Sequence, residues 1–269
     1  MNDFFKGKTV AVTGGSDGIG KALVTLLIQA GANVATCART PQKLEQLKTL
    51  FADKPFWCVP ADVSVYEDCK HFIEGAIEQF GCIDILINNA GISMRAELKD
   101  ADVTVFKKVM DINYLGTVYC TKLALQSIIN NKGTIVGVSS IAGYRGLPGR
   151  SGYSASKFAV NGWLEAVRTE LIQEGVNVMW VCPGFTQSNI RNAALNEKAA
   201  AQGESPLEEG SLMSSTECAQ HILKAIEKRK RTLVLTFTGK RTVFMNKFFA
   251  ALTDKLTYNF FYKKGKLIK

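Results

Sequence analysis

The sequence predicts a single α/β domain in which one parallel sheet carries helices on both faces. Short β-branched runs alternate with helical apolar patterns along most of the 269 residues. Such alternation is typical of parallel sheets that are covered on both sides. The first run also leads directly into a glycine-rich turn and then a helical pattern, as at the start of a βαβ unit. The length suits one core of this class.

The elements follow one another in a regular order. Seven strands are expected at 8–13, 33–37, 56–60, 83–88, 133–139, 176–182 and 232–236. Six helices are expected at 18–30, 41–52, 65–80, 102–130, 152–174 and 215–230. No linker or repeat interrupts them. We therefore assign residues 1–238 to one domain and residues 239–269 to a C-terminal extension that is not an independent domain.

The glycine turn is the first candidate site. The β-branched run ends at Thr13, the glycines are Gly14, Gly18 and Gly20, and the following helical pattern ends at Gly31. Glycines allow the backbone to approach a pyrophosphate closely, and a helix N-terminus supplies free N–H groups. This context favours dinucleotide binding in a Rossmann-type, doubly wound sheet over a plain turn, although the spacing departs from Gly-x-Gly-x-x-Gly.

A tyrosine and a lysine form the second candidate site. Tyr153 and Lys157 are four residues apart, which puts them on one face if the segment is helical. A nearby cation favours the charged form of a phenol, so we expect Lys157 to lower the pKa of Tyr153 and prime it for proton exchange. A solvated helix face is the alternative when the pair is considered alone.

Several short motifs then occur in a fixed order over roughly residues 8 to 236. They are Thr13-Gly14-x-x-x-Gly18-x-Gly20, Asn88-Asn89-Ala90-Gly91, Asn113, Ser140 thirteen residues before Tyr153, Tyr153-x-x-x-Lys157 and Pro183-Gly184. This ordered set resembles the short-chain dehydrogenases/reductases. The resemblance implies hydride transfer between nicotinamide C4 and a carbonyl carbon.

The resemblance also implies a role for each site residue. Tyr153 is the general acid or base, Ser140 binds the substrate oxygen, and Lys157 binds the nicotinamide ribose. Asn113 holds a water that connects Lys157 to solvent. The implied cofactor contacts are Gly14, Ser16, Gly18, Ile19, Gly20, Arg39, Asp62, Val63, Asn89, Tyr153, Lys157, Pro183, Gly184, Thr186 and Ser188. Strand alternation is expected to point the neighbouring Ser139 to the other side.

The end of the second strand predicts the cofactor type. NAD-preferring relatives usually carry an acidic residue where this chain has Ala38, and Arg39 follows. A guanidinium suits a 2′-phosphate, and Ser16 adds a hydroxyl. Asp17, where many NADP-using relatives carry a basic residue, argues the other way. We expect NADP(H) to be favoured over NAD(H); a solvated loop arginine is the alternative.

Other residue types exclude several classes of protein. The seven scattered cysteines indicate free thiols in a reducing cytosol. His71 and His221 lack neighbours at metal-ligand spacing, so we expect surface positions and no metal. Neither a signal peptide nor a long uncharged apolar run is apparent, and we expect a cytoplasmic protein.

The net charge of +9 is concentrated at the C-terminus. Thirteen Lys and Arg residues against two acids lie from Lys224 onward, whereas 20 basic and 22 acidic residues precede them. Phe244, Phe248, Leu252, Leu256 and Phe260 repeat every four residues, flanked by lysines that end at Lys269. A basic amphipathic helix of this kind predicts peripheral membrane contact through 241–269. Packing on the enzyme's own core or on a partner subunit is the alternative, and no nucleic-acid-reading motif is present.

We therefore expect an NADP(H)-dependent enzyme that reduces a ketone or oxidises a secondary alcohol. The expected substrate is small and apolar or lipid-like: a steroid, an acyl compound or a 3-keto sphingoid compound. The alternative is an NAD(P)-binding scaffold or a membrane-surface interaction protein without turnover. The resemblance further implies a homodimer or homotetramer, and a mobile lid over the substrate within residues 188–214.

Overall fold

The computed structural model describes residues 3–204 and 212–268. Its centre is a parallel sheet with the order β3-β2-β1-β4-β5-β6-β7. The strands are β1 (Thr9–Thr13), β2 (Asn33–Ala38), β3 (Phe56–Pro60), β4 (Ile85–Asn88), β5 (Thr134–Val138), β6 (Asn177–Cys182) and β7 (Thr232–Val234). The predicted strands and the predicted fold class are confirmed.

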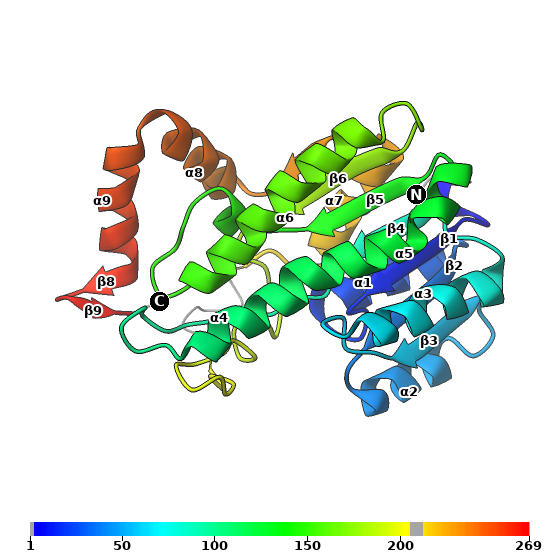
Figure 1. The fold of residues 1–269 in the computed structure, drawn as a ribbon, viewed down its shortest axis with the longest axis horizontal. Helices are drawn as coiled ribbons and strands as arrows, with labels where there is room; N and C mark the ends of the chain where they lie inside the picture. Colours follow the sequence, from blue (N-terminus) through cyan, green and yellow to red (C-terminus); the bar gives the residue numbers. More distant parts are fainter. Residues whose placement is uncertain (1–2, 205–211, 269) are drawn as a thin grey trace.

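Helices cover both faces of the sheet (Figure 1). One face carries α3 (Tyr66–Phe80), α4 (Val103–Met110), α5 (Gly116–Asn130) and α6 (Ser151–Glu170). The other face carries α1 (Gly18–Gln29), α2 (Pro41–Leu50) and α7 (Ser215–Glu227). Three short helical turns complete the domain: η1 (Asp3–Phe5), η2 (Asp111–Leu115) and η3 (Ile141–Gly143).

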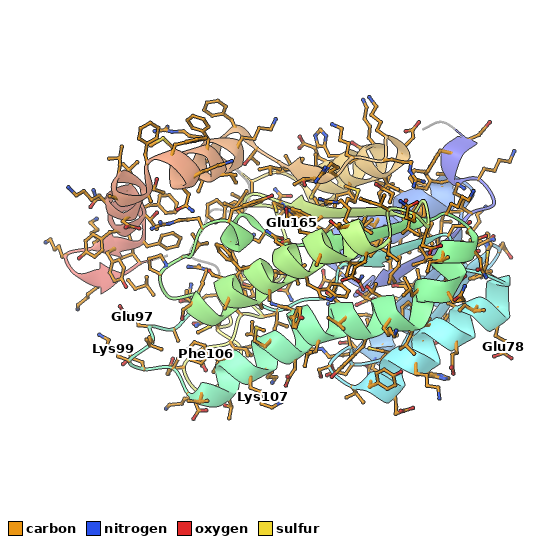
Figure 2. The ribbon with its side chains drawn as sticks, turned by 45° about the horizontal axis from the view of Figure 1, so that its top comes forward. Glu78, Glu97, Lys99, Phe106, Lys107 and Glu165 are labelled. Atoms are coloured by element: carbon orange, nitrogen blue, oxygen red, sulfur yellow. The ribbon has the colours of Figure 1, made fainter. Side chains whose placement is uncertain are left out.

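The helices turn apolar side chains inward and charged ones outward. Glu78, Lys107 and Glu165 lie on the outer faces of α3, α4 and α6 and are exposed (Figure 2). Phe106 of α4 packs so closely on α6 that a Cβ at Gly152 would come within 2.8 Å of its ring. A side chain at position 152 would therefore separate α4 from the helix that carries Tyr153.

The order of the strands in the sheet determines where the site lies. From β1 the chain moves outward to β3 and then returns to form β4 on the other side of β1. Ligands in such sheets bind beyond the carboxyl ends of the strands at this reversal point. The glycine turn follows β1, Asn89 follows β4, Ser140 follows β5 and Pro183 follows β6, so the fold gathers the predicted motifs at one edge.

The predicted helix 102–130 is wrong in one respect. The chain is helical throughout, but η2 widens it by one π-helical turn between α4 and α5. Asn113, inside this turn, accepts a hydrogen bond from Ile92 N (2.8 Å) and donates to Ile92 O and Ser156 Oγ (both 2.9 Å). These bonds tie the widened turn to the loop after β4 and to α6, and such insertions are frequent at functional sites.

The predicted single helix in the C-terminal extension is also wrong. Two helices, α8 (Phe237–Phe248) and α9 (Ala250–Phe261), are separated at Phe249, whose φ of −136° and ψ of 52° are not helical. The hairpin β8 (Tyr262–Lys263) and β9 (Lys266–Leu267) follows. The predicted boundary at 238/239 lies inside α8, and Lys269 lies outside the described residues.

The extension lies against the domain on the side remote from the N-terminus (Figure 1). Arg145 donates to Asn246 Oδ1 (2.9 Å) and Asp254 Oδ1 (2.6 Å), and Tyr262 donates to Glu97 Oε1 (2.8 Å). These contacts attach α8, α9 and β8 to two loops at the site edge of the sheet. Within residues 3–204 and 212–268, no helix has the length and apolar character needed to cross a bilayer.

Candidate active site

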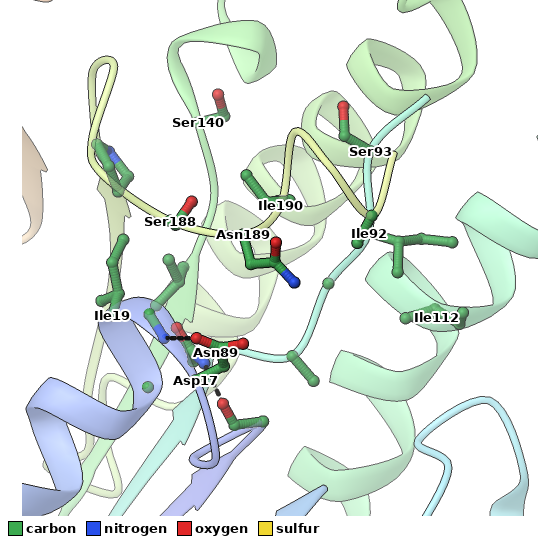
Figure 3. Close-up of a pocket in the computed structure, with 18 of the residues that line it drawn as sticks. Asp17, Ile19, Asn89, Ile92, Ser93, Ile112, Ser140, Ser188, Asn189 and Ile190 are labelled. Atoms are coloured by element: carbon green, nitrogen blue, oxygen red, sulfur yellow. Dashed lines mark hydrogen bonds between the residues drawn. The ribbon is translucent and has the colours of Figure 1, made fainter. Parts of the chain in front are cut away.

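One cavity of about 490 Å³ runs along the carboxyl edge of the sheet. Figure 3 shows Asp17, Asn89 and Ser188 around the glycine turn and Ser140 farther along the cavity. Every predicted site residue except Asn113 lines it: Gly14, Ser16, Gly18, Ile19, Gly20, Arg39, Asp62, Val63, Asn89, Ser140, Tyr153, Lys157, Pro183, Gly184, Thr186 and Ser188.

The glycine turn leaves room only for backbone. Gly14 and Gly18 have φ values of +69° and +50°, which other residues adopt with strain. A Cβ on Gly20 would lie 2.1 Å from Gly14 O, and one on Gly18 would lie 3.2 Å from Ser188 Cβ. The turn therefore presents backbone and the start of α1 to the cavity. This arrangement fits the diphosphate of a dinucleotide.

Asn89 joins the end of β4 to the glycine turn. Its Nδ2 donates to Thr13 O (3.0 Å) and Gly14 O (3.1 Å), and the backbone N atoms of Asn89 and Ala90 donate to Thr13 Oγ1. These bonds fix the two strand ends that meet at the reversal point of the sheet. The sequence assigned Asn89 to cofactor contact; in the structure its amide nitrogen also holds the turn in shape.

The loop after β2 brings a basic residue that sequence analysis missed. Lys43, in the first turn of α2, lines the cavity with Arg39 and forms an ion pair of 2.5 Å with Asp17. Burial raises the pKa of Asp17, but its bonds to Lys43 and Gly18 N outweigh this, so that the pKa is lowered. The signal was available: Lys43 lies four residues after Arg39, and Pro41 marks the helix start.

The Tyr153 hydroxyl lies at the other end of the cavity and is hydrogen-bonded to Ser140. Tyr153 is 9% exposed, so the alternative of a solvated helix face is excluded. The predicted lowering of its pKa is wrong. Burial raises the pKa of Tyr153, and the Ser140 hydrogen bond and the charge of Arg150 only partly oppose this. The four-residue spacing correctly predicted that Tyr153 and Lys157 share one helix, but it did not account for the desolvation of the phenol.

Lys157 lies on the same helix and is 4% exposed. Its Nζ is 5.8 Å from the centre of the Tyr153 ring and donates to Val138 O at 2.9 Å. Burial lowers the pKa of Lys157 to about 8. The ammonium is thus attached to the last residue of β5, within reach of the tyrosine and of the cavity.

Asn113 lies behind the cavity wall and not in it. A Cβ on Gly91 would lie 3.1 Å from Asn113 Oδ1 and 3.4 Å from Lys157 Nζ. The two side chains therefore flank the same glycine from different helices. Asn113 positions the loop after β4, while Lys157 reaches the cavity past it.

Ser140 and Ser139 point to different partners. Ser140 Oγ accepts from Ala142 N (3.1 Å) at the start of η3 and is bonded to Tyr153. Ser139 Oγ donates to Lys157 O at 3.4 Å, inside the packing of α6. Of the two hydroxyls, that of Ser140 is hydrogen-bonded to the tyrosine. The prediction that Ser139 points to the other side is wrong, because Ser139 also lines the cavity and its hydroxyl faces α6, the helix that carries Tyr153.

Two arginines at the tyrosine end were also missed. Arg150 lies three residues before Tyr153, just before α6 begins, and Arg191 lies in the connection after β6; both line the cavity. Residues 188–193 belong to the predicted lid segment, and all of them except Asn192 line the cavity. Residues 205–211 of that segment lie outside the described residues. Arg150 could have been found from its spacing to Tyr153, whereas nothing local marks Arg191.

The histidines and the buried cysteines add no catalytic group to the candidate site. His71 and His221 are exposed on α3 and α7, as predicted. Burial raises the pKa of Cys37, Cys182 and Cys218 to about 12, so these thiols remain protonated at neutral pH. In the part of the chain that the structure describes, no group of three His, Cys, Asp or Glu side chains could hold a metal ion.

Comparisons with known proteins agree with this geometry. The family model "short chain dehydrogenase" matches residues 8–199. A dehydrogenase/reductase SDR family protein 7-like of Dictyostelium discoideum is 30% identical over 265 residues, covering 95% of this chain and 82% of that protein. Dehydrogenase/reductase SDR family member 7B of Mus musculus is 33% identical, covering 87% and 74%.

A solved structure shares the fold. It is a short chain dehydrogenase/reductase SDR from Burkholderia phymatum in complex with NAD, with a TM-score of 0.83, 22% identity, and coverage of 94% of this chain and 96% of that one. The family match and the relatives extend over most of the chain. The chain belongs to the short-chain dehydrogenase/reductase family, whose members are oxidoreductases that bind a nicotinamide cofactor.

Proposed function

We propose that this protein is an NADP(H)-dependent oxidoreductase that reduces a ketone, or oxidises a secondary alcohol. The observation that carries the proposal is the single cavity that joins the glycine turn to the Tyr153–Ser140 pair. A nicotinamide cofactor supplies the hydride in the reductive direction. The protein then has to hold the carbonyl and provide one proton.

Each residue of the site has its own role in this proposed reaction. Tyr153 gives its proton to the developing alkoxide, and the raised pKa keeps it protonated at neutral pH. Ser140, bonded to the same phenol, also donates to the substrate oxygen and holds it in line. The Lys157 ammonium binds the ribose beside the nicotinamide, and Asn113 orders the path by which a proton is returned. General acid catalysis of this kind contributes about 10²–10⁴-fold.

Two basic residues support the choice of NADP(H). Arg39 is exposed at the rim of the cavity, and Lys43 adds a second cation beside it. The ion pair with Lys43 neutralises Asp17, the acidic residue that argued for NAD(H). A 2′-phosphate placed here meets the Arg39 guanidinium, while Lys43 offsets the charge of Asp17, and charge-assisted bonds of this type are strong.

The cavity also supports an apolar or lipid-like substrate. Ile92, Leu147, Phe185 and Ile190 line it together with Tyr153. Such walls favour a steroid, an acyl compound or a 3-keto sphingoid compound over a sugar, because apolar contact area contributes most of the binding free energy there.

A spectrophotometric screen tests this function. NADPH and NADH oxidation are followed with a panel of steroid, long-chain and short-chain ketones. We expect turnover with NADPH on at least one lipophilic ketone, and slower turnover with NADH. Cofactor binding without turnover of any ketone or secondary alcohol would instead support a scaffold without catalysis.

We further propose a cytoplasmic protein that contacts the membrane surface through 241–269. On α8 and α9, Phe244, Phe248 and Leu252 are 56%, 59% and 49% exposed, and Lys247 lies between them. Exposed aromatic and basic residues on these two helices suit the interface of an anionic bilayer. The expected assembly is a homodimer or homotetramer, which light scattering of the purified protein measures.

A further inference from the structure

A second hollow lies between the start of α6 and the C-terminal extension, outside the active-site cavity. Its volume is about 730 Å³, and it is lined by the loop before α6, by the first residues of α6, and by α9 and β8. Leu147, in that loop, also lines the cavity that contains Tyr153. The active-site cavity and the second hollow therefore meet at the Leu147 side chain.

The walls of the second hollow are mostly apolar. Pro148, Ala155 and Phe158 line it on the domain side. The stacked rings of Tyr258 and Tyr262, with 4.8 Å between their centres, line it on the side of the extension. Phe158 and Tyr258 are 46% and 53% exposed, so both rings keep surface in contact with water. An apolar ligand that covered this surface would gain binding free energy from its removal from water.

The charged groups at the second hollow are paired with each other. Among its described lining residues, Arg145 and Asp254 are the charged ones, and Arg145 donates to Asp254 Oδ1 at 2.6 Å. Tyr262 directs its hydroxyl to Glu97 at 2.8 Å. An ionic ligand would have to compete with the Arg145–Asp254 pair, whereas an uncharged chain leaves it intact. The hollow therefore suits a neutral alkyl chain better than a charged group.

Leu147 is held in place through its backbone. Its N atom donates to Ser154 Oγ at 3.1 Å, and its O atom accepts from Arg150 N at 3.1 Å. The side chain is half-buried and belongs to the walls of both spaces. A change of rotamer moves the isobutyl group without breaking either backbone bond. An alkyl chain can thus pass from the cavity into the hollow while the loop keeps its position.

We propose that the substrate carries an unbranched alkyl chain whose far end occupies the second hollow, so that the extension forms part of the substrate site. The word "substrate" rests on the proposed function, which this proposal narrows. A chain rotates about each C–C bond and can follow the path past Leu147, whereas the fused rings of a steroid cannot. Each methylene group that becomes buried on this path strengthens binding by about 4-fold.

Binding of ketones of increasing chain length to the NADP⁺-saturated protein tests the path. The ligands are 2-octanone, 2-decanone and 2-tetradecanone, each kept below its solubility limit, with Kd measured by equilibrium dialysis and mass spectrometry. A ketone cannot accept a hydride from the oxidised cofactor, so the measurement does not depend on turnover. We expect the Kd to fall by at least about 10-fold from 2-octanone to 2-tetradecanone.

Variants that fill the second hollow separate it from the active-site cavity. Ala155→Trp fills it from α6, and Thr257→Trp fills it from α9. Each should raise the Kd for 2-tetradecanone by about 10-fold and leave that for 2-octanone within about 2-fold, because the short chain remains in the cavity. Ala251→Trp is the matched control, since Ala251 is exposed on α9 and does not line the hollow. If one filling variant does not fold, the other decides the matter.

The outcomes distinguish this proposal from the proposed function. Equal Kd values for the three ketones, or filling variants that bind 2-tetradecanone as tightly as the control does, would overturn the path. Filling variants that change the mass measured by light scattering but not the dependence on chain length would assign the hollow to a contact between copies of the chain, which also rejects it. The expected binding pattern in a protein that turns over no ketone would retain the path and reject the proposed reaction.

Discussion

Tyr153 and Lys157 lie one helical turn apart, and burial affects their pKa values in opposite directions. The pKa of the tyrosine rises and that of the lysine falls to about 8, because desolvation favours the neutral form of each. A protonated phenol suits a proton donor. At the residue scale, therefore, desolvation of the phenol supports the proposed role of Tyr153 as proton donor.

Lys157 makes the stability of the protein depend on pH. Its ordinary pKa is 10.5 and its pKa in the folded protein is about 8, so between these values the unfolded chain binds a proton that the folded chain does not. The contribution of Lys157 to stability therefore rises with pH in this window. Chemical denaturation should show the gain in unfolding free energy from Lys157→Met shrinking from pH 8 to pH 10.5, by at most about 3 kcal/mol. A difference that stays constant over this range would contradict the buried lysine.

Arg39 and Lys43 are expected to select the cofactor. Arg39→Ala and Lys43→Ala should each raise the KM for NADPH about 10-fold and leave that for NADH nearly unchanged, because only NADPH carries the 2′-phosphate. Lys48→Ala is the control, since Lys48 pairs with Glu45 on the same helix and does not line the cavity. An equal rise in KM for both cofactors would show that these residues do not bind the 2′-phosphate.

At the scale of elements, the C-terminal extension packs against the segments that form the candidate active site. Phe260 stacks on Phe185 of the cavity wall at 6.2 Å between ring centres, and a Cβ on Gly149 would lie 2.5 Å from Leu267. The loop that leads from Ser140 to Tyr153 is thus covered by α9 and the β8–β9 hairpin. A change in the extension is expected to reach the catalytic pair through this loop.

Arg145 is the residue that most directly attaches the extension. Its side chain is 15% exposed and bonds to Asn246 and Asp254, while Asn246 donates to Tyr144 O at 2.8 Å. Arg145→Ala should cost about 1–2 kcal/mol, since Asp254 is largely exposed. Hydrogen–deuterium exchange should then accelerate in α8 and α9 but not in α7. Lys255→Ala, at an exposed position of α9, is the control; unchanged exchange in Arg145→Ala would reject this attachment.

The predicted and observed elements differ where a structure depends on contacts between distant parts of the chain. The glycine turn and Tyr-x-x-x-Lys are local, so their spacing alone predicted their geometry. The break at Phe249 was missed because the four-residue repeat from Phe244 continues across it, and the contacts of Asn246 and Asp254 are made with distant loops. Arg191 was missed for the same reason: only the folded chain brings it beside Tyr153.

At the scale of the whole molecule, the extension lies on the side remote from the N-terminus (Figure 1) and carries exposed apolar side chains. It also reaches the cavity, because Phe260 stacks on Phe185 of the cavity wall. If this side meets the bilayer, lipophilic substrates enter the cavity next to the surface that holds them. Co-sedimentation with anionic liposomes should retain the wild-type protein. The triple variant Phe244→Ser, Phe248→Ser, Leu252→Ser should lose most of this binding, because these side chains are about half exposed and carry the apolar contact.

A second triple variant controls for general loss of apolar surface. Val103, Leu98 and Leu50 are 79%, 75% and 62% exposed and lie outside the extension. Serine at these three positions should leave liposome binding intact. Equal binding by the two triple variants, or no binding by the wild-type protein, would remove the membrane proposal.

The central claim is that the Tyr153 hydroxyl delivers the proton to the substrate oxygen. Tyr153→Phe removes that hydroxyl and keeps the ring that packs in the wall of the cavity. We expect kcat/KM for the best ketone to fall by about 10²–10⁴-fold, while the Kd for NADPH, measured by titration, stays within about 3-fold of wild type, a change of less than about 1 kcal/mol. Turnover in the variant close to that of the wild-type enzyme would contradict the claim.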